Sequence, residues 1–136
     1  MDEEVVRVIQ SSWNQLLGKE EAVVIRFYER LFIEHPEYRP LFTQSKKVQR
    51  AKFLSMLNII INGLDNLEFL SDPLTSLGKK HGGMGIINED YENVASALIN
   101  AIDEVSDKPL SDIERRSWFE GLMTVSKVMM KASDPC

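Results

Sequence analysis

Apolar residues recur at intervals of three and four along almost the whole chain, the spacing that places them on one face of an α-helix. The first such stretch runs from Val5 to Leu16, and Gly18 closes it. The second runs from Val23 to Phe32 and stops before Pro36, a residue type that ends helices. No convincing alternation of apolar and polar residues indicates a β-strand. The pattern predicts an all-α protein.

The middle of the chain predicts a short helical turn, a polar loop and a long apolar helix. One turn of helix is expected over residues 36–42, and a loop over residues 43–47. The segment 48–64 is strongly apolar and is too long for a strand. Its expected inward side chains are Val48, Phe53, Leu54, Leu57, Ile60, Ile61 and Leu64.

The last three helices are expected to begin at capping residues. Asp72 would cap a helix whose first residue is Pro73, and Asn88 would cap the next. Ser111 and Glu114 have the spacing of a capping box for the final helix. The side chains expected to face inward are Leu74, Leu77 and His81, then Tyr91, Val94, Ala95, Leu98, Ala101, Ile102 and Val105, and then Ile113, Trp118, Leu122, Val125 and Met129.

Composition agrees with a single domain over residues 1–136, built from about seven helices. A net charge of −5 argues against nucleic acid and anionic membranes as partners. No apolar run approaches the roughly 18 residues of a membrane span, and the acidic N-terminus is unlike a secretory signal. The single cysteine, Cys136, is expected to be inert or to link two chains on oxidation. We therefore expect a cytoplasmic monomer or weak homodimer.

Only two histidines are present, which restricts the chemistry. His35 precedes Pro36 at a helix end, where a cation would meet the negative end of the helix dipole. His81 shares a helical face with Leu74 and Leu77 and precedes Gly82-Gly83, which would end that helix. Periodicity alone leaves two interpretations of His81 open, a core histidine bonded to backbone and a metal ligand. The sequence lacks motifs for zinc, covalent haem, phosphate loops and serine hydrolases.

Several motifs in a fixed order carry a resemblance to a known family. They are FYERLFIEHPEYRPLF (27–42), QRAKF (49–53), LGKKHGGMGI (77–86), YENV (91–94) and the late Trp118. The chain resembles single-domain bacterial globins, the globin half of flavohaemoglobins, and neuroglobin-like proteins. The resemblance implies a globin fold around non-covalent haem b.

The same resemblance implies a role for particular residues. His81 matches the proximal iron ligand, and Phe42 matches the phenylalanine that packs on the porphyrin. Tyr28 and Gln49 match distal positions, where an O–H and an N–H would donate hydrogen bonds to a bound gas. The alternatives are a surface hydroxyl for Tyr28 and a solvated amide for Gln49. Lys52 is implied to contact a haem propionate, and the alternative is a solvated lysine. The remaining implied cofactor contacts, along the pocket walls, are Phe53, Leu77, Ile86, Tyr91 and Val94.

The function implied by the resemblance is reversible binding of O₂, and of CO and NO, with no residue assigned as catalytic with certainty. One alternative is nitric oxide dioxygenase activity, which would need a separate reductase because no flavin- or nicotinamide-binding sequence is present. A second alternative is a gas or redox sensor. Two features depart from flavohaemoglobins. The glutamate that would bond the Tyr91–His81 pair is missing, since its place falls near Pro135, and Phe53 is bulkier than the aliphatic residue of many relatives.

Overall fold

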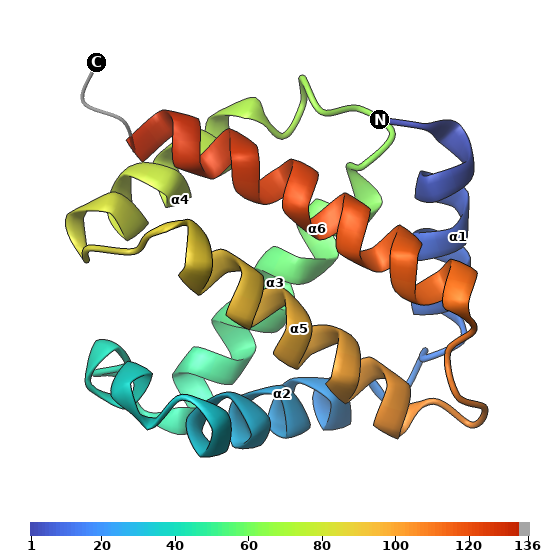
Figure 1. Cartoon of the computed structure of the whole chain (residues 1–136), viewed down its shortest axis with the longest axis horizontal. Helices are drawn as coiled ribbons and strands as arrows, with labels where there is room; N and C mark the ends of the chain where they lie inside the picture. The colour runs from blue at the N-terminus through green and yellow to red at the C-terminus, as the bar shows by residue number, and fades with distance from the viewer. Residues whose placement is uncertain (134–136) are drawn as a thin grey trace.

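The computed structural model describes residues 1–133, which form helices and connecting segments without a strand (Figure 1). The helices are α1 (Glu3–Asn14), α2 (Glu20–Glu34), the 3₁₀ helix η1 (Pro36–Leu41), α3 (Lys46–Asn62), α4 (Ser71–Gly83), α5 (Asn88–Val105) and α6 (Asp112–Ser133). The predicted all-α class and its number of helices are confirmed.

Helix α6 is the longest, and it packs against α1, α4 and α5 (Figure 1). Helix α2 packs against α5 on one side and α3 on another. The interior between them contains most of the predicted apolar faces, because each amphipathic helix removes one stripe from water. Fully buried members of this core include Leu16, Val23, Leu31, Leu74, Ile102 and Trp118.

Two residues that the periodicity placed inside are exposed. Val48 is 43% exposed and Ile113 is 59% exposed. Each lies in the first turn of its helix, α3 and α6 respectively. Periodicity predicts which face of a helix is apolar, but it does not tell how far along that face the neighbouring helices extend.

The predicted capping box of α6 is confirmed. The Ser111 backbone N–H donates to the Glu114 carboxylate at 2.9 Å, and the Glu114 N–H donates to the Ser111 hydroxyl at 3.1 Å. These two bonds satisfy N–H groups that have no partner within the helix itself.

The predicted caps of α4 and α5 are wrong. Helix α4 starts at Ser71 and follows Leu70, so Asp72 and Pro73 lie inside its first turn. Consecutive turns over residues 66–71 lead directly into α4, so no extended residue is left at position 72 to cap it. Helix α5 follows Ile87, so Asn88 is already its first residue.

Helix α4 approaches α6 closely through two glycines one turn apart. A Cβ at Gly78 would overlap the backbone of Met129, and a Cβ at Gly82 would come within 2.6 Å of the Ser133 side chain. Gly82 and Gly83 were expected to end this helix just after His81, but α4 includes both of them. This contact fixes the rotation of α4 about its axis, and therefore the direction in which His81 on the adjacent face can point.

Within residues 1–133, no helix is long and apolar enough to cross a membrane.

Candidate functional site

His81 is held in one orientation by Tyr91. The imidazole lies on α4 and is partly buried, and its Nδ1 is 3.2 Å from the hydroxyl of Tyr91 in the first turn of α5. The two rings meet edge to face, with centroids 5.8 Å apart. Burial lowers the pKa of the His81 imidazole, and the charge of Lys80 adds to this effect. A neutral imidazole with Nδ1 engaged leaves Nε2 available as a ligand atom.

Tyr28 occupies the centre of an aromatic cluster. Its side chain is largely buried. Its ring contacts Phe27, Phe32, Phe42 and Phe53, with centroid distances between 5.1 and 5.9 Å. Burial raises the pKa of the Tyr28 phenol to about 12. In the part of the chain that the structure describes, its hydroxyl makes no hydrogen bond, and protein atoms do not enclose it completely.

Three predicted site residues meet in this cluster although they come from different elements. Phe42 follows η1 and packs edge-on against Tyr28 at 5.5 Å. Phe53 on α3 stacks on Phe27 at 4.6 Å and lies 5.7 Å from Tyr28. These residues are 11 to 25 positions apart in the sequence, and the fold brings them into one aromatic wall that carries the Tyr28 hydroxyl.

Gln49 lies beside the loop that precedes α3. With its carboxamide oxygen turned toward that loop, it accepts hydrogen bonds from the backbone N–H groups of Thr43 at 3.2 Å and Gln44 at 3.1 Å. No hydrogen bond between Gln49 and Tyr28 is found among residues 1–133. The oxygen is therefore committed to the loop, while the NH₂ group keeps its two donor hydrogens. Lys52, one turn further along α3, is exposed.

The other predicted wall residues are partly buried and pack against the core. Leu77 precedes His81 by about one turn of α4, and Val94 follows Tyr91 in α5. Ile86 lies in the segment between these helices, where its N–H donates to the His81 carbonyl at 3.1 Å. Helix α4 has no Cα atom within 8 Å of one in α3, as far as the described residues go. The helices that carry the two halves of the predicted site are thus held apart.

One neighbour of Tyr28 was not anticipated. Arg50 is close enough for its positive charge to oppose the rise in the Tyr28 pKa. The sequence gave no signal for it, because the apolar pattern placed Val48 and Phe53 inside in this part of α3 and the resemblance added Gln49.

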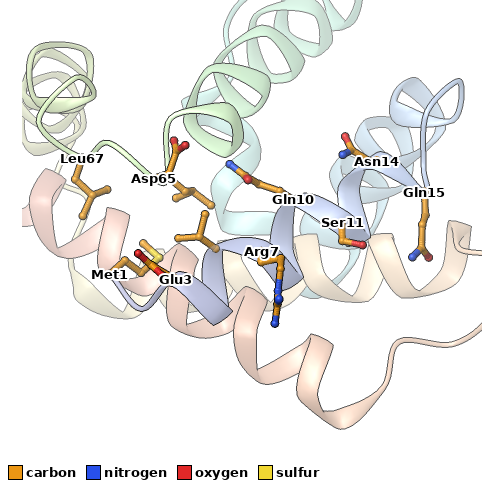
Figure 2. A pocket seen from close by; sticks show the side chains of 11 residues that line it. Met1, Glu3, Arg7, Gln10, Ser11, Asn14, Gln15, Asp65 and Leu67 are labelled. Atoms are coloured by element: carbon orange, nitrogen blue, oxygen red, sulfur yellow. The ribbon is translucent and has the colours of Figure 1, made fainter.

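A hollow of the surface lies elsewhere, between α1 and the segment after α3 (Figure 2). Its lining mixes polar and apolar side chains and contains none of the predicted site residues. The lining residues are Met1, Glu3, Val6, Arg7, Gln10, Ser11, Asn14, Gln15, Leu64, Asp65 and Leu67.

Comparison with known proteins decides the family. The family model described as Globin matches residues 25–129, a stretch that contains the whole candidate site. The chain is a globin.

Relatives and solved structures agree with this assignment. This globin is 30% identical over 123 residues to a flavohemoprotein of Bacillus cereus, covering 88% of this chain and 30% of that protein. It is 26% identical over 130 residues to an uncharacterized globin-like protein of Aquifex aeolicus, covering 96% and 92% of the two chains. The globin thus spans about a third of the length of the flavohemoproteins it matches.

Two solved structures share its fold. One is an engineered carbene transferase derived from a putative nitric oxide dioxygenase of Rhodothermus marinus, with a TM-score of 0.85, 23% identity and coverage of 96% and 92%. The other is haemoglobin from the botfly Gasterophilus intestinalis, with a TM-score of 0.81, 14% identity and coverage of 98% and 99%. The predicted globin fold is therefore confirmed.

The residues present suit the haem that the family implies. Haem needs one axial ligand and an apolar surround, and His81 offers an Nε2 atom on a neutral, oriented imidazole. The Tyr28 hydroxyl makes no hydrogen bond within residues 1–133, which suits donation to a polar ligand beside an apolar aromatic wall. His35 has a different environment, since its Nδ1 lies 3.5 Å from Glu37 and its ring stacks on Tyr38. It ends α2, as the sequence suggested.

Proposed function

We propose that this globin holds haem b non-covalently through His81 and reversibly binds O₂, and also CO and NO. The observation that carries the proposal is the Tyr28 side chain, which is largely buried among aromatic rings and whose hydroxyl donates no hydrogen bond within residues 1–133. Haem would supply a ferrous iron that binds diatomic gases. A fixed O–H donor in an apolar surround favours O₂ over CO, because O₂ becomes polar when it is bound and CO does so much less.

The chain's own residues divide the work of holding the cofactor. His81 ligates through Nε2 while the Tyr91 hydroxyl holds Nδ1, and Phe42 packs against the porphyrin. Lys52 is exposed on α3, where its flexible ammonium can reach a propionate. The walls would be formed by Phe53, Leu77, Ile86 and Val94.

Gln49 is proposed as the second donor to the bound gas. Its carboxamide oxygen is satisfied by the backbone of residues 43–44, which constrains the amide plane. The NH₂ group therefore keeps a defined direction and two hydrogens to donate. Neither Gln49 nor Tyr28 changes its charge near neutral pH, so both donors persist across physiological conditions.

The proposal is tested by Tyr28→Phe, which removes one O–H and keeps the ring. A hydrogen bond to a charged acceptor contributes about 1.5–3 kcal/mol, or roughly ten- to a hundredfold in an equilibrium constant. O₂ dissociation, measured by stopped-flow or flash photolysis, should accelerate by about that factor. CO dissociation is the internal control, because bound CO is much less polar. Equal acceleration of both gases would show that Tyr28 acts only through its bulk.

The second candidate is nitric oxide dioxygenation, in which the O₂-bound globin converts NO to nitrate. It is favoured by the relatives, since flavohemoproteins and a putative nitric oxide dioxygenase are among them. Continued turnover would need a separate reductase to return the iron to the ferrous state. Mixing the O₂-bound protein with NO in a single turnover tests it, and a slow reaction with no nitrate would reject this activity.

A further inference from the structure

A chain of hydrogen bonds connects η1 with the start of α5. The Tyr38 hydroxyl donates to Asp90 Oδ1 at 2.6 Å and accepts from Asn93 Nδ2 at 2.9 Å. The second carboxylate oxygen, Asp90 Oδ2, accepts the backbone N–H of Ile87 at 2.9 Å. Tyr38 is buried and Asp90 and Asn93 are partly buried, so the two bonds at the Tyr38 hydroxyl are partly shielded from water, whereas the bond from Ile87 is exposed.

Side chains make this connection, because the two backbones stay apart. Over the residues that the structure covers, no Cα of η1 lies within 8 Å of a Cα of α5. The phenol of Tyr38 spans this separation and meets a carboxylate on the far side. Removal of its hydroxyl would leave Asp90 and Asn93 without this partner across the gap.

The connected residues flank both halves of the candidate site. Tyr38 lies in the helix that leads into Phe42, the aromatic partner of Tyr28. Asp90 is the residue before Tyr91, whose hydroxyl meets His81. Ile87 ends the segment that joins the end of α4 to α5, so its bond to Asp90 holds that segment as well.

We propose that Tyr38, Asp90 and Asn93 form a clasp that positions the Tyr91 hydroxyl and thereby the His81 imidazole. They are positioning residues, since none of them touches His81. The inference rests on the proposed function only in taking His81 as the haem ligand. Its physical basis is that a hydrogen bond at 3.2 Å weakens steeply with distance and angle. A small rotation of the first turn of α5 would therefore release the imidazole.

The test compares Tyr38→Phe and Asp90→Asn with the wild-type full chain. Resonance Raman spectroscopy of the ferrous protein measures the iron–histidine stretching band, which reports the hydrogen bond at Nδ1. We expect the band to shift or split in both variants, as it also should in Tyr91→Phe. Haem transfer to excess apomyoglobin should accelerate by about tenfold, the effect of losing roughly one hydrogen bond to a carboxylate.

Ser12→Ala is the matched control. Ser12 accepts a buried hydrogen bond of 3.0 Å from the Trp118 indole, between α1 and α6 and away from every site residue. Ser12→Ala should lower the unfolding midpoint as the clasp variants do, but it should leave the iron–histidine band and the haem transfer rate unchanged. Clasp variants that match Ser12→Ala in every readout would overturn the proposal, because the clasp would then serve stability alone.

A second readout separates this proposal from the haem assignment. With ¹⁵N-labelled histidine, the signals of the two imidazoles can be followed in the full chain as purified. Tyr38→Phe should move the Nδ1 signal of His81 toward that of Tyr91→Phe. A wild-type chain without haem would contradict the proposed function, yet this shift would still support the clasp. An unchanged His81 signal in Tyr38→Phe, with a changed one in Tyr91→Phe, would overturn it.

Discussion

The Nδ1 atom of the His81 imidazole lies 3.2 Å from the phenol oxygen of Tyr91. With Nε2 as the iron ligand, Nδ1 carries a proton and donates it to that oxygen. A neutral phenol is a weaker acceptor than a carboxylate, so it draws less of the proton and leaves the imidazole less anionic. The place near Pro135, where a flavohaemoglobin has its glutamate, lies outside the described residues.

We therefore predict little electronic push from His81 toward the iron. The iron–histidine stretching frequency of the ferrous protein should be low, and peroxidase activity should be weak, while single-turnover reaction with NO stays fast. A high frequency typical of peroxidases would show that a carboxylate or carbonyl acts on Nδ1 after all. Efficient peroxide turnover at a low frequency would contradict the link between push and activity.

The close approach of α4 to α6 makes a second prediction. Gly78→Ala should destabilise the protein by about 1–3 kcal/mol, because the added methyl group overlaps the Met129 backbone. Gly83→Ala is the control, since nothing lies within 4 Å of its added Cβ. Because alanine is a better helix former than glycine, Gly83→Ala should not lower the free energy of unfolding and should raise it by up to about 1 kcal/mol. Urea unfolding measures both, and equal midpoints would contradict the packing described here.

Two substitutions separate the roles of Gln49. Gln49→Glu keeps oxygens that can accept from Thr43 and Gln44 but removes the NH₂ donor, whereas Gln49→Leu removes both functions. If the amide donates to the bound gas, both variants should speed O₂ dissociation. If Gln49 only anchors the loop, the Glu variant should behave as the wild type does and only the Leu variant should differ. Flash photolysis of the O₂ complexes decides between the two.

The raised pKa of Tyr28 predicts how stability changes at alkaline pH. Burial sets the phenol pKa at about 12 in the folded chain, above the value near 10 of an exposed tyrosine. The stability linked to the neutral phenol is complete below about pH 10 and is lost as the pH rises toward 12. Urea unfolding between pH 9 and pH 11 should show a smaller decline for Tyr28→Phe than for the wild type. Parallel declines would show that Tyr28 ionises freely in the folded state.

Local patterns were sufficient for most of the fold but not for its helix starts. The apolar faces that contain Trp13, Leu31 and Trp118 extend over several helical turns. A single residue more or less on such a face does not change which side of the helix is apolar. A helix start depends on one or two residues, and tertiary structure can move it. The turns before Ser71 moved the start of α4 to that residue, so Asp72 lies inside the helix.

Some features of the candidate site could likewise be predicted from the sequence, and others could not. The resemblance to globins selected Tyr28, Phe42 and Phe53, and the fold brings these rings together. It could not show the bond between Tyr38 and Asp90, which joins residues 52 positions apart and follows no periodicity. Nor could it show that the Gln49 oxygen binds the backbone of its own loop, because that depends on the conformation of residues 43–45.

The central claim is that His81 holds the haem, and titration of the chain with haemin tests it most directly. The wild type should bind one equivalent with an intense Soret band, and acidic butanone should extract the haem because no covalent bond holds it. His81→Gly should bind weakly and recover a wild-type ferrous spectrum when free imidazole is added. A His81→Gly variant with wild-type spectra and affinity in the absence of imidazole would contradict the claim.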